Sequence, residues 1–311
     1  MIRAEALTKQ YGPLTAADNV TFTVQPGEVL GFLGPNGAGK TTTMRMLAGF
    51  VAPTSGRAEI CGFSVEEKPT EAKKCLGYMP EGAPSYGEMT PREFLNFIAN
   101  IRRLRGDHRK ARLDEVIAAL HLGPVLNQRI ETLSKGFRRR VGLAQAIVHD
   151  PPVLILDEPT DGLDPNQKHE VRQLINAISK EKIIVISTHI LEEVDAVCTR
   201  AIVIASGRVV ADETPDVMIR RSRYHNAVTL RFEKAASLKD AAAELRALQD
   251  VERVEVDEAT RSITAFPKRA ALILTAISDL AGARKWPLEQ LHLESGRMDE
   301  VFRSITQQEV A

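Results

Sequence analysis

The segment from Gly34 to Thr41 constrains the fold of this chain more than any other. It reads Gly-Pro-Asn-Gly-Ala-Gly-Lys-Thr, follows the apolar run from Glu28 to Leu33, and precedes a stretch with helical spacing that ends near Gly49. A strand, a glycine-rich loop of this spacing and a helix, in that order, form a phosphate-binding loop. The chain is therefore predicted to contain an α/β sheet with this loop at the end of one strand.

The chemistry of the loop predicts binding of ATP together with Mg²⁺. Glycines allow backbone N–H groups to close around phosphate oxygens, and the helix N-terminus adds a partial positive charge. Lys40 adds a full charge, and the Thr41 hydroxyl can coordinate Mg²⁺. The alternative, a glycine-rich turn without a ligand, is disfavoured by the flanking strand and helix. The predicted ATP contacts are Gly34, Pro35, Asn36, Gly37, Ala38, Gly39, Lys40, Thr41 and Thr42.

Uninterrupted apolar runs recur further along the chain and alternate with helical stretches. The runs Val153 to Leu156, Ile183 to Ser187 and Ala201 to Ala205 predict parallel strands buried on both faces of a sheet. Helices are predicted between them, from Pro165 to Ser179 and from Leu191 to Cys198. This alternation is typical of an α/β fold.

Two regions differ from this parallel core. The β-rich runs Ile2 to Tyr11 and Ala17 to Val24 predict an antiparallel flap ahead of the phosphate loop. Residues 88–150 predict a helical insert, whose first helix is marked by Thr90-Pro91-Arg92-Glu93, a cap residue followed by proline and an acid. Further helices of the insert are predicted from Asp114 to Leu122 and from Lys135 to His149.

The pattern loosens between Val210 and Arg223, which we interpret as a linker that divides the chain into domains at 1–220 and 221–311. Beyond it, strand and helix patterns follow in the order βαββαβ, which predicts a small α+β ferredoxin-like domain. Its elements are predicted at Ala227 to Phe232, Leu238 to Leu248, Val251 to Val256, Ser262 to Phe266, Arg269 to Ala283 and Leu288 to Leu293. The single tryptophan, Trp286, is predicted to belong to its core.

Composition limits the environment and the partners of the chain. The 41 Lys and Arg residues balance 41 Asp and Glu residues, so no overall field would draw the protein to nucleic acid. No apolar window approaches the roughly 18 residues that a membrane-spanning helix needs. The three cysteines, Cys61, Cys75 and Cys198, lack Cys-x-x-Cys spacing and predict buried thiols rather than disulfides or a zinc site. We therefore expect a soluble, cytoplasmic chain.

Two carboxylates follow the apolar run Val153 to Leu156, at the sheet edge where ligands bind in α/β folds. Asp157 is predicted to hold Mg²⁺ through water. Glu158 is predicted to orient or deprotonate the water that attacks the γ-phosphorus. Solvated acids at a strand end are the alternative, which the upstream phosphate loop disfavours.

The motifs that follow give the chain a specific resemblance. Leu133-Ser134-Lys135-Gly136-Phe137 opens a helix with a serine cap, Gly162-Leu163-Asp164 follows the paired carboxylates, and His189 follows a strand. In content and order these motifs, with the phosphate loop, resemble the ATP-binding subunits of ABC transporters over residues 1 to about 220. Within that family the first motif is the signature motif, the second is the D-loop, and the histidine is the switch residue.

The resemblance implies a composite ATP site between two copies of the chain. Ser134 and Gly136 would present a second helix N-terminus to the ATP held by the phosphate loop of the other copy, in a head-to-tail dimer. His189 would sense the γ-phosphate, and Tyr11 would stack on adenine. For His189 the alternative is an ordinary strand-end histidine, and for Arg138 to Arg140 a solvated basic face remains open.

Two departures from the common family pattern resemble the type 2 exporters, whose ATPases are separate from their membrane permeases. Lys135 and Phe137 replace a glycine and a glutamine, and Glu81 stands where many members carry a glutamine that touches Mg²⁺. The stretch Gly82 to Met89 would form part of a groove for a permease helix; an ordinary exposed loop is the alternative.

The sequence thus predicts an ATP-hydrolysing motor subunit of an exporter, peripheral on the inner face of the cell membrane, working as a dimer on a separate permease. A soluble ABC ATPase acting on nucleic acid or ribosomes is the alternative, although the coiled-coil, zinc or tandem modules of such machines are not recognisable here. A scaffold that binds ATP without hydrolysis is disfavoured because Glu158 is present. A regulatory or dimer-supporting role is the hypothesis for residues 221–311.

Overall fold

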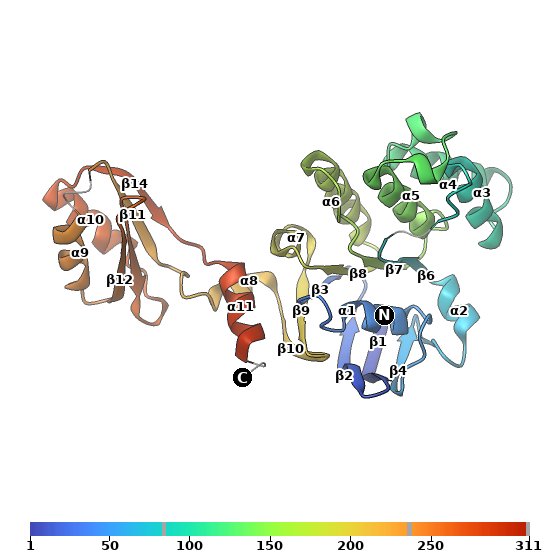
Figure 1. Cartoon of the computed structure of the whole chain (residues 1–311), viewed down its shortest axis with the longest axis horizontal. Coiled ribbons are helices and arrows are strands. Elements are labelled where there is room, and N and C mark those ends of the chain that lie inside the picture. The colour runs from blue at the N-terminus through green and yellow to red at the C-terminus, as the bar shows by residue number, and fades with distance from the viewer. Residues whose placement is uncertain (83–84, 235–237, 309–311) are drawn as a thin grey trace. The chain divides into compact units, whose positions relative to one another are not determined.

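The computed structural model describes residues 1–82, 85–234 and 238–308. They divide into two compact units, Met1–Pro215 with Gln308, and Asp216–Gln307. Figure 1 shows the elements of both. The predicted linker is wrong in its details, because its first residues belong to strand β10 (Arg208–Glu213) and helix α8 (Pro215–Arg220) follows. Proline at the first helical position and the acid after it favour such a helix start.

The first unit is built on a six-stranded sheet with the order β10-β9-β3-β8-β7-β6. Strands β3, β6, β7, β8 and β9 run parallel, and β10 pairs antiparallel at one edge. Every residue of β3, β7 and β8 is buried, as their uninterrupted apolar runs predict for a sheet covered on both faces. The parallel strands are β3 (Val29–Leu33), β6 (Leu76–Met79), β7 (Val153–Asp157), β8 (Ile183–Thr188) and β9 (Arg200–Ala205).

Helices cover one face of this sheet, and a second sheet with one helix covers the other (Figure 1). Helices α5 (Lys135–Ile147), α6 (Pro165–Ser179) and α7 (Leu191–Val197) lie on the first side. On the second side lie helix α1 (Lys40–Leu47) and the predicted antiparallel flap, of order β2-β1-β4-β5. The flap comprises β1 (Ile2–Tyr11), β2 (Leu14–Val24), β4 (Ser55–Ile60) and β5 (Phe63–Ser64), with helix α2 (Pro69–Lys74) after it.

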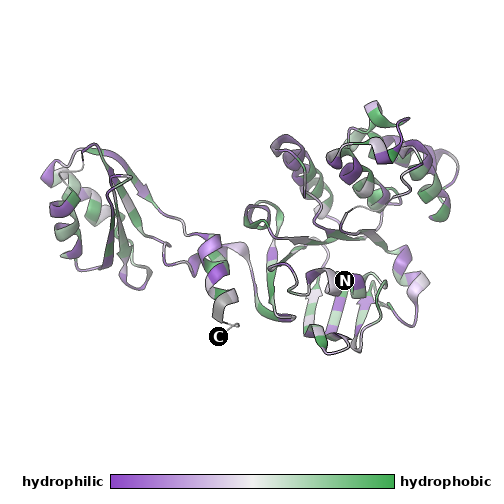
Figure 2. Cartoon of the chain, viewed as in Figure 1, coloured by the Kyte–Doolittle hydropathy of each residue, from purple (hydrophilic) through white to green (hydrophobic). Residues whose placement is uncertain are grey.

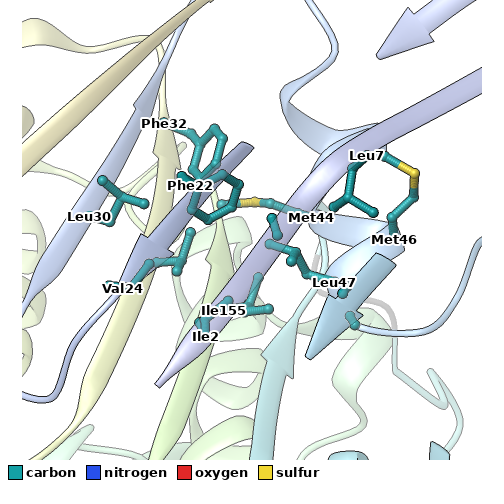
Figure 3. Packing of buried hydrophobic residues seen from close by; sticks show 14 of the residues in the cluster. Ile2, Leu7, Phe22, Val24, Leu30, Phe32, Met44, Met46, Leu47 and Ile155 are labelled. Atoms are coloured by element: carbon teal, nitrogen blue, oxygen red, sulfur yellow. The ribbon is translucent and has the colours of Figure 1, made fainter. Parts of the chain in front are cut away.

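The core between the flap and the main sheet fixes the phosphate loop in place. Phe22 of β2 meets Phe32 of β3 edge to face at a ring-centroid distance of 5.2 Å. Figure 3 shows Met44 and Leu47 of α1 in the same cluster, which also includes Ile155 of β7. Because α1 is packed on both sheets, the loop that joins it to β3 has fixed ends.

The helical insert consists of α3 (Pro91–Ile101), α4 (Gly106–Ala119), two short 3₁₀ turns (Gly123–Val125 and Ile130–Thr132) and α5. The predicted cap of α3 is confirmed: the Thr90 hydroxyl accepts the Glu93 N–H at 3.3 Å, and the Glu93 carboxylate accepts the Thr90 N–H at 2.8 Å. The predicted start of α4 at Asp114 is wrong by eight residues. The only buried residue of α4 is Val116, so the first turns of this helix carry no apolar period that would mark its start.

The second unit has the predicted ferredoxin-like topology. Its antiparallel sheet has the order β12-β13-β11-β14, and α9 and α10 carry buried residues of the same core. Figure 2 shows hydrophilic residues on the side of α9 that faces away from the sheet. Trp286 packs against this core, with its ring centroid 5.9 Å from that of Phe232. The elements are β11 (Val228–Phe232), α9 (Leu238–Arg246), β12 (Val251–Asp257), β13 (Ser262–Pro267), a 3₁₀ turn (Lys268–Ala270), α10 (Leu274–Arg284), β14 (Leu288–Leu293) and α11 (Met298–Gln308).

The start of α10 and the burial of two cysteines differ from the sequence predictions. Helix α10 begins at Leu274 rather than Arg269, because Arg269 has a left-handed backbone with φ of 48°. All three cysteines are free, but only Cys198 is buried, while Cys61 and Cys75 are partly exposed. No helix in the described part of the chain is long and apolar enough to cross a membrane.

We expect His149, at the end of the insert, to make the stability of the first unit depend on pH. Burial and nearby arginine and lysine charges lower its pKa from 6.5 to about 4, although the Leu76 carbonyl, 3.1 Å from Nε2, opposes the shift. Its Nδ1 is buried without a partner among the described residues, so the proton that charges the ring would lack a hydrogen-bond acceptor there. The unfolded chain takes up that proton near pH 6.5, so stability falls by about 3 kcal/mol as the pH drops from 7 to 4.

Urea denaturation of the wild type and of His149→Gln at several pH values measures this contribution, and exposed His108→Gln serves as the control. The His149 variant should lose less stability between pH 7 and 4 than the other two proteins. Equal losses in all three would show that His149 titrates normally in the folded state.

Candidate functional site

The phosphate loop has the backbone that its glycines predict. Strand β3 ends at Leu33 and α1 begins at Lys40, with Gly39 at the N-cap in a left-handed conformation (φ 107°). A Cβ atom on Gly39 would lie 2.3 Å from the Ala16 carbonyl oxygen, and one on Gly34 would lie 2.4 Å from that of Ile204. Glycine is therefore required at both positions by space, and at Gly39 by its dihedral angle as well.

Lys40 lies inside this loop. Only 6% of the residue is exposed, and its Nζ donates to the carbonyl oxygens of Gly34 at 2.6 Å and Pro35 at 3.1 Å. Burial lowers the pKa of Lys40, whereas the carboxylates of Glu158, Asp157 and Glu81 act to raise it. The ammonium group is thus held against the backbone of the loop, where a bound phosphate would contact both this charge and the N–H groups of the loop.

A hollow of about 360 Å³ opens beside the loop and brings together residues from four parts of the sequence. Gly34, Pro35 and Ala38 shape the loop but do not line this hollow. Leu14 and Ala16, which the sequence analysis missed, line it because the β1–β2 hairpin lies against the loop. The lining residues are Tyr11, Leu14, Ala16, Asn36, Gly37, Gly39, Lys40, Thr41, Thr42, Glu81 and Glu158.

Asp157 fits the predicted indirect contact with Mg²⁺. It is 1% exposed, and its Oδ1 accepts a hydrogen bond from the Ser187 hydroxyl. Its Oδ2 is buried and has no protein partner within the described ranges. Mg²⁺ in nucleotide sites keeps several waters and takes few protein ligands. An orphaned carboxylate oxygen matches a water-mediated role, and the half-buried Thr41 hydroxyl matches a direct one.

Glu158 and His189 lie next to each other although they are separated by 31 positions in the chain. Their side chains meet at 3.0 Å, between Glu158 Oε1 and His189 Nδ1. Glu158 has a left-handed backbone (φ 51°), and its N–H donates to the Ser187 hydroxyl at 3.0 Å. Ser187, another residue that the sequence analysis missed, therefore contacts both members of the Asp157-Glu158 pair.

Ser134 and Gly136 lie outside the hollow. Ser134 is exposed and caps α5, since its hydroxyl accepts the Phe137 N–H at 3.3 Å. Gly136 is buried against Gln167, whose Oε1 would lie 2.6 Å from a Cβ at this position. The start of α5 is thus a helix N-terminus that does not line the hollow.

Comparison with known proteins agrees with this geometry. Residues 17–161 match the family model described as "ABC transporter". Nod factor export ATP-binding protein I of Paraburkholderia xenovorans (strain LB400) is 35% identical over 83% of this chain and 84% of its own length. The chain belongs to the ABC transporter ATP-binding proteins.

Other members of the family are longer or known in three dimensions. The probable multidrug ABC transporter ATP-binding protein YbhF of Escherichia coli (strain K12) is 36% identical to this chain. The match covers 70% of this chain but only 37% of YbhF. A solved structure titled "Structure of ATP binding subunit of ABC transporter" is 31% identical, with a TM-score of 0.67, over 71% of this chain and 92% of that one. The ABC ATPase fold is thereby confirmed for the first unit.

The basic run after the signature motif differs from a solvated face. Arg139 and Arg140 are buried, and only Arg138 is exposed. Arg139 Nη2 lies 3.1 Å from the Asp161 carboxylate, and Arg140 Nη2 lies 2.9 Å from that of Glu170. These contacts join the signature helix of this ABC protein to the D-loop region and to α6.

Lys135, one of the departures from the usual signature, takes part in the same junction. Its Nζ lies 2.8 Å from the Asp161 carboxylate, and hydrogen bonding to Lys135, with the charge of Arg139, lowers the Asp161 pKa. The lysine stem lies so close to Gly162 (φ 72°) that a Cβ there would be 2.5 Å from its Cδ. The predicted signature motif and the predicted D-loop are thus connected within one chain.

The suggested permease groove is described in part. Residues 83 and 84 of the stretch Gly82 to Met89 lie outside the described residues. Tyr86 is 57% exposed, and its ring contacts those of Phe94 and Phe97 at 6.2 and 5.6 Å. Glu81 is exposed and lines the hollow beside the phosphate loop, and its contact with Mg²⁺ stays a prediction.

Proposed function

We propose that two copies of this ATP-hydrolysing subunit bind head to tail, each ATP lying between the phosphate loop of one copy and the signature helix of the other. The observation that carries this proposal is the position of Ser134, which is exposed and does not line the hollow beside the phosphate loop. A second helix N-terminus facing the γ-phosphate would add positive potential where ATP brings negative charge.

The residues of the hollow have distinct proposed roles. Lys40 and the loop N–H groups bind the β- and γ-phosphates, and Tyr11, 47% exposed at the rim, stacks on adenine. Mg²⁺, held by Thr41 and through water by Asp157, neutralises phosphate charge when bound. Glu158 orients and deprotonates the attacking water, and His189 binds the γ-phosphate while its Nδ1 contacts Glu158.

The partner proposed for the dimer is a separate membrane permease, and the direction proposed is export. Two relatives are named for Nod factor export and for multidrug transport, and Lys135, Phe137 and Glu81 follow the type 2 exporter pattern. The exposed Tyr86 and helix α3 provide the surface for a permease helix. The location proposed for the subunit is accordingly the inner face of the membrane. The same relatives disfavour action on nucleic acid or ribosomes.

Mixing two impaired variants, at an ATP concentration too low to saturate Lys40→Ala, tests the composite site. Lys40→Ala disables the phosphate loop, and Ser134→Arg blocks the signature helix with a bulky cation. A mixed dimer contains one site made only of unmodified halves, so a one-to-one mixture should regain about a quarter of the wild-type sites by random pairing. ATPase activity of the mixture, against each variant alone, is the measurement. A mixture no more active than its components would contradict the head-to-tail arrangement.

A further inference from the structure

The strongest unexplained feature of the first unit is a buried carboxylate, Glu193 on helix α7. Only 2% of this residue is exposed, and it does not line the ATP hollow. A buried carboxylate is costly unless hydrogen bonds and opposite charges compensate it. The identity of its partners therefore indicates what the fold uses it for.

Both oxygens of Glu193 are hydrogen-bonded to threonine hydroxyls that flank the proposed catalytic pair. The Thr160 hydroxyl donates to Oε1, and the Thr188 hydroxyl donates to Oε2 at 2.9 Å. Thr160 lies two residues after Glu158, and Thr188 lies immediately before His189. One carboxylate thus connects the segment after β7 to the end of β8.

Further hydrogen bonds hold each of these two segments in place beside its proposed catalytic residue, His189 in one and Glu158 in the other. The Thr188 hydroxyl also accepts the N–H of Ile190 at 3.0 Å, so it bridges across His189. On the other side, the N–H of Asp161 donates to the Glu158 carbonyl at 3.2 Å. The cations of Lys168 and Arg172 lie 3.9 and 4.0 Å from Glu193 Oε1 and offset its charge.

We propose that Glu193 is a positioning residue that holds Glu158 and His189 at the spacing at which their side chains meet. Ser187 fixes the same two strand ends on the side of Asp157, and Glu193 fixes them on the side of Thr160 and Thr188. The inference rests on the catalytic roles proposed for Glu158 and His189. It predicts an effect on turnover and none on ATP affinity, because Glu193 does not contact the hollow.

Glu193→Gln in the full chain tests this. Glutamine has the same shape but a single acceptor oxygen, so one threonine loses its acceptor. We expect kcat to fall by about 10- to 100-fold, the range for a small misplacement of catalytic groups. The Kd for ATP should be unchanged. Glu192→Gln, at the exposed neighbouring position on α7, should retain wild-type kcat.

A double-mutant cycle separates positioning from a general loss of stability. In a His189→Ala background the catalytic pair no longer exists, so Glu193→Gln should lower kcat by less than about twofold. A full additional loss in that background would overturn the inference. If Glu193→Gln does not fold, Thr188→Val removes the hydrogen bonds of this hydroxyl to Glu193 and to the Ile190 N–H, and it should show the same dependence on His189.

The outcomes also separate this inference from the proposal beneath it. Wild-type turnover in both Glu158→Gln and His189→Ala would refute the proposed catalytic roles. Reduced turnover in those variants with wild-type kcat in Glu193→Gln would refute only the positioning role.

Discussion

Glu158→Gln is expected to lower ATP turnover by about 10²- to 10⁴-fold, the range for loss of a positioned general base. Glutamine keeps the length and shape of the side chain but cannot take a proton from water. The carboxylate is 15% exposed, lines the hollow and lies 3.0 Å from His189. Glu81 is the other acid among the lining residues, so few groups are available to replace Glu158 as the base.

The same variant is expected to keep its affinity for ATP and to accumulate as the ATP-bound dimer, since the step that would release the dimer is slowed. Steady-state hydrolysis, nucleotide binding and size-exclusion chromatography with ATP measure the three properties. Glu192→Gln, exposed and outside the site, is the matched control. Hydrolysis at the normal rate would remove Glu158 from the catalytic role.

Lys40→Ala is expected to act on binding itself, weakening ATP affinity by about 10- to 100-fold, as the loss of a charge-assisted hydrogen bond predicts. Lys40 is the cation in the lining of the hollow, and its Nζ already lies at hydrogen-bond distance from the loop backbone. The variant should stay folded, because burial of the ammonium group disfavours its charged form in the free protein.

Equilibrium titration with a fluorescent ATP analogue measures the change, with thermal unfolding as the check on folding. Lys180→Ala removes an exposed lysine at the end of α6 and should bind like the wild type. Equal affinities for Lys40→Ala and the wild type would contradict the proposed role of Lys40 in holding phosphate.

The parts of the site that depend on consecutive residues could be predicted from the sequence. The loop from Gly34 to Thr41 is a local backbone structure, and Asp157 with Glu158 follows directly from the end of a buried strand. Both segments follow the carboxyl ends of parallel strands, so they are predicted to lie at the same edge of the sheet. The positions of Ser187 and Glu193 relative to this pair do not, because side-chain contacts between separate loops depend on tertiary packing.

The errors have a similar physical origin. The polar first turns of α4 carry no apolar period, so the sequence pattern predicts its start too late. The left-handed backbone of Arg269 likewise makes α10 begin later than its pattern predicts. The buried Arg139 and Arg140 resemble a solvated basic run unless Asp161 and Glu170 are known to lie beside them. By contrast, the βαββαβ order sufficed for the ferredoxin-like topology, which few other arrangements of these elements satisfy.

The exposed cap at Ser134 has a consequence for how activity depends on the amount of protein. An isolated copy carries half of each proposed site, so hydrolysis per chain should rise with concentration until pairing saturates. Two copies tethered to one permease would meet at an effective concentration in the millimolar range, on the order found for short linkers. Weak self-association would then keep free copies from consuming ATP and confine hydrolysis to assembled transporters.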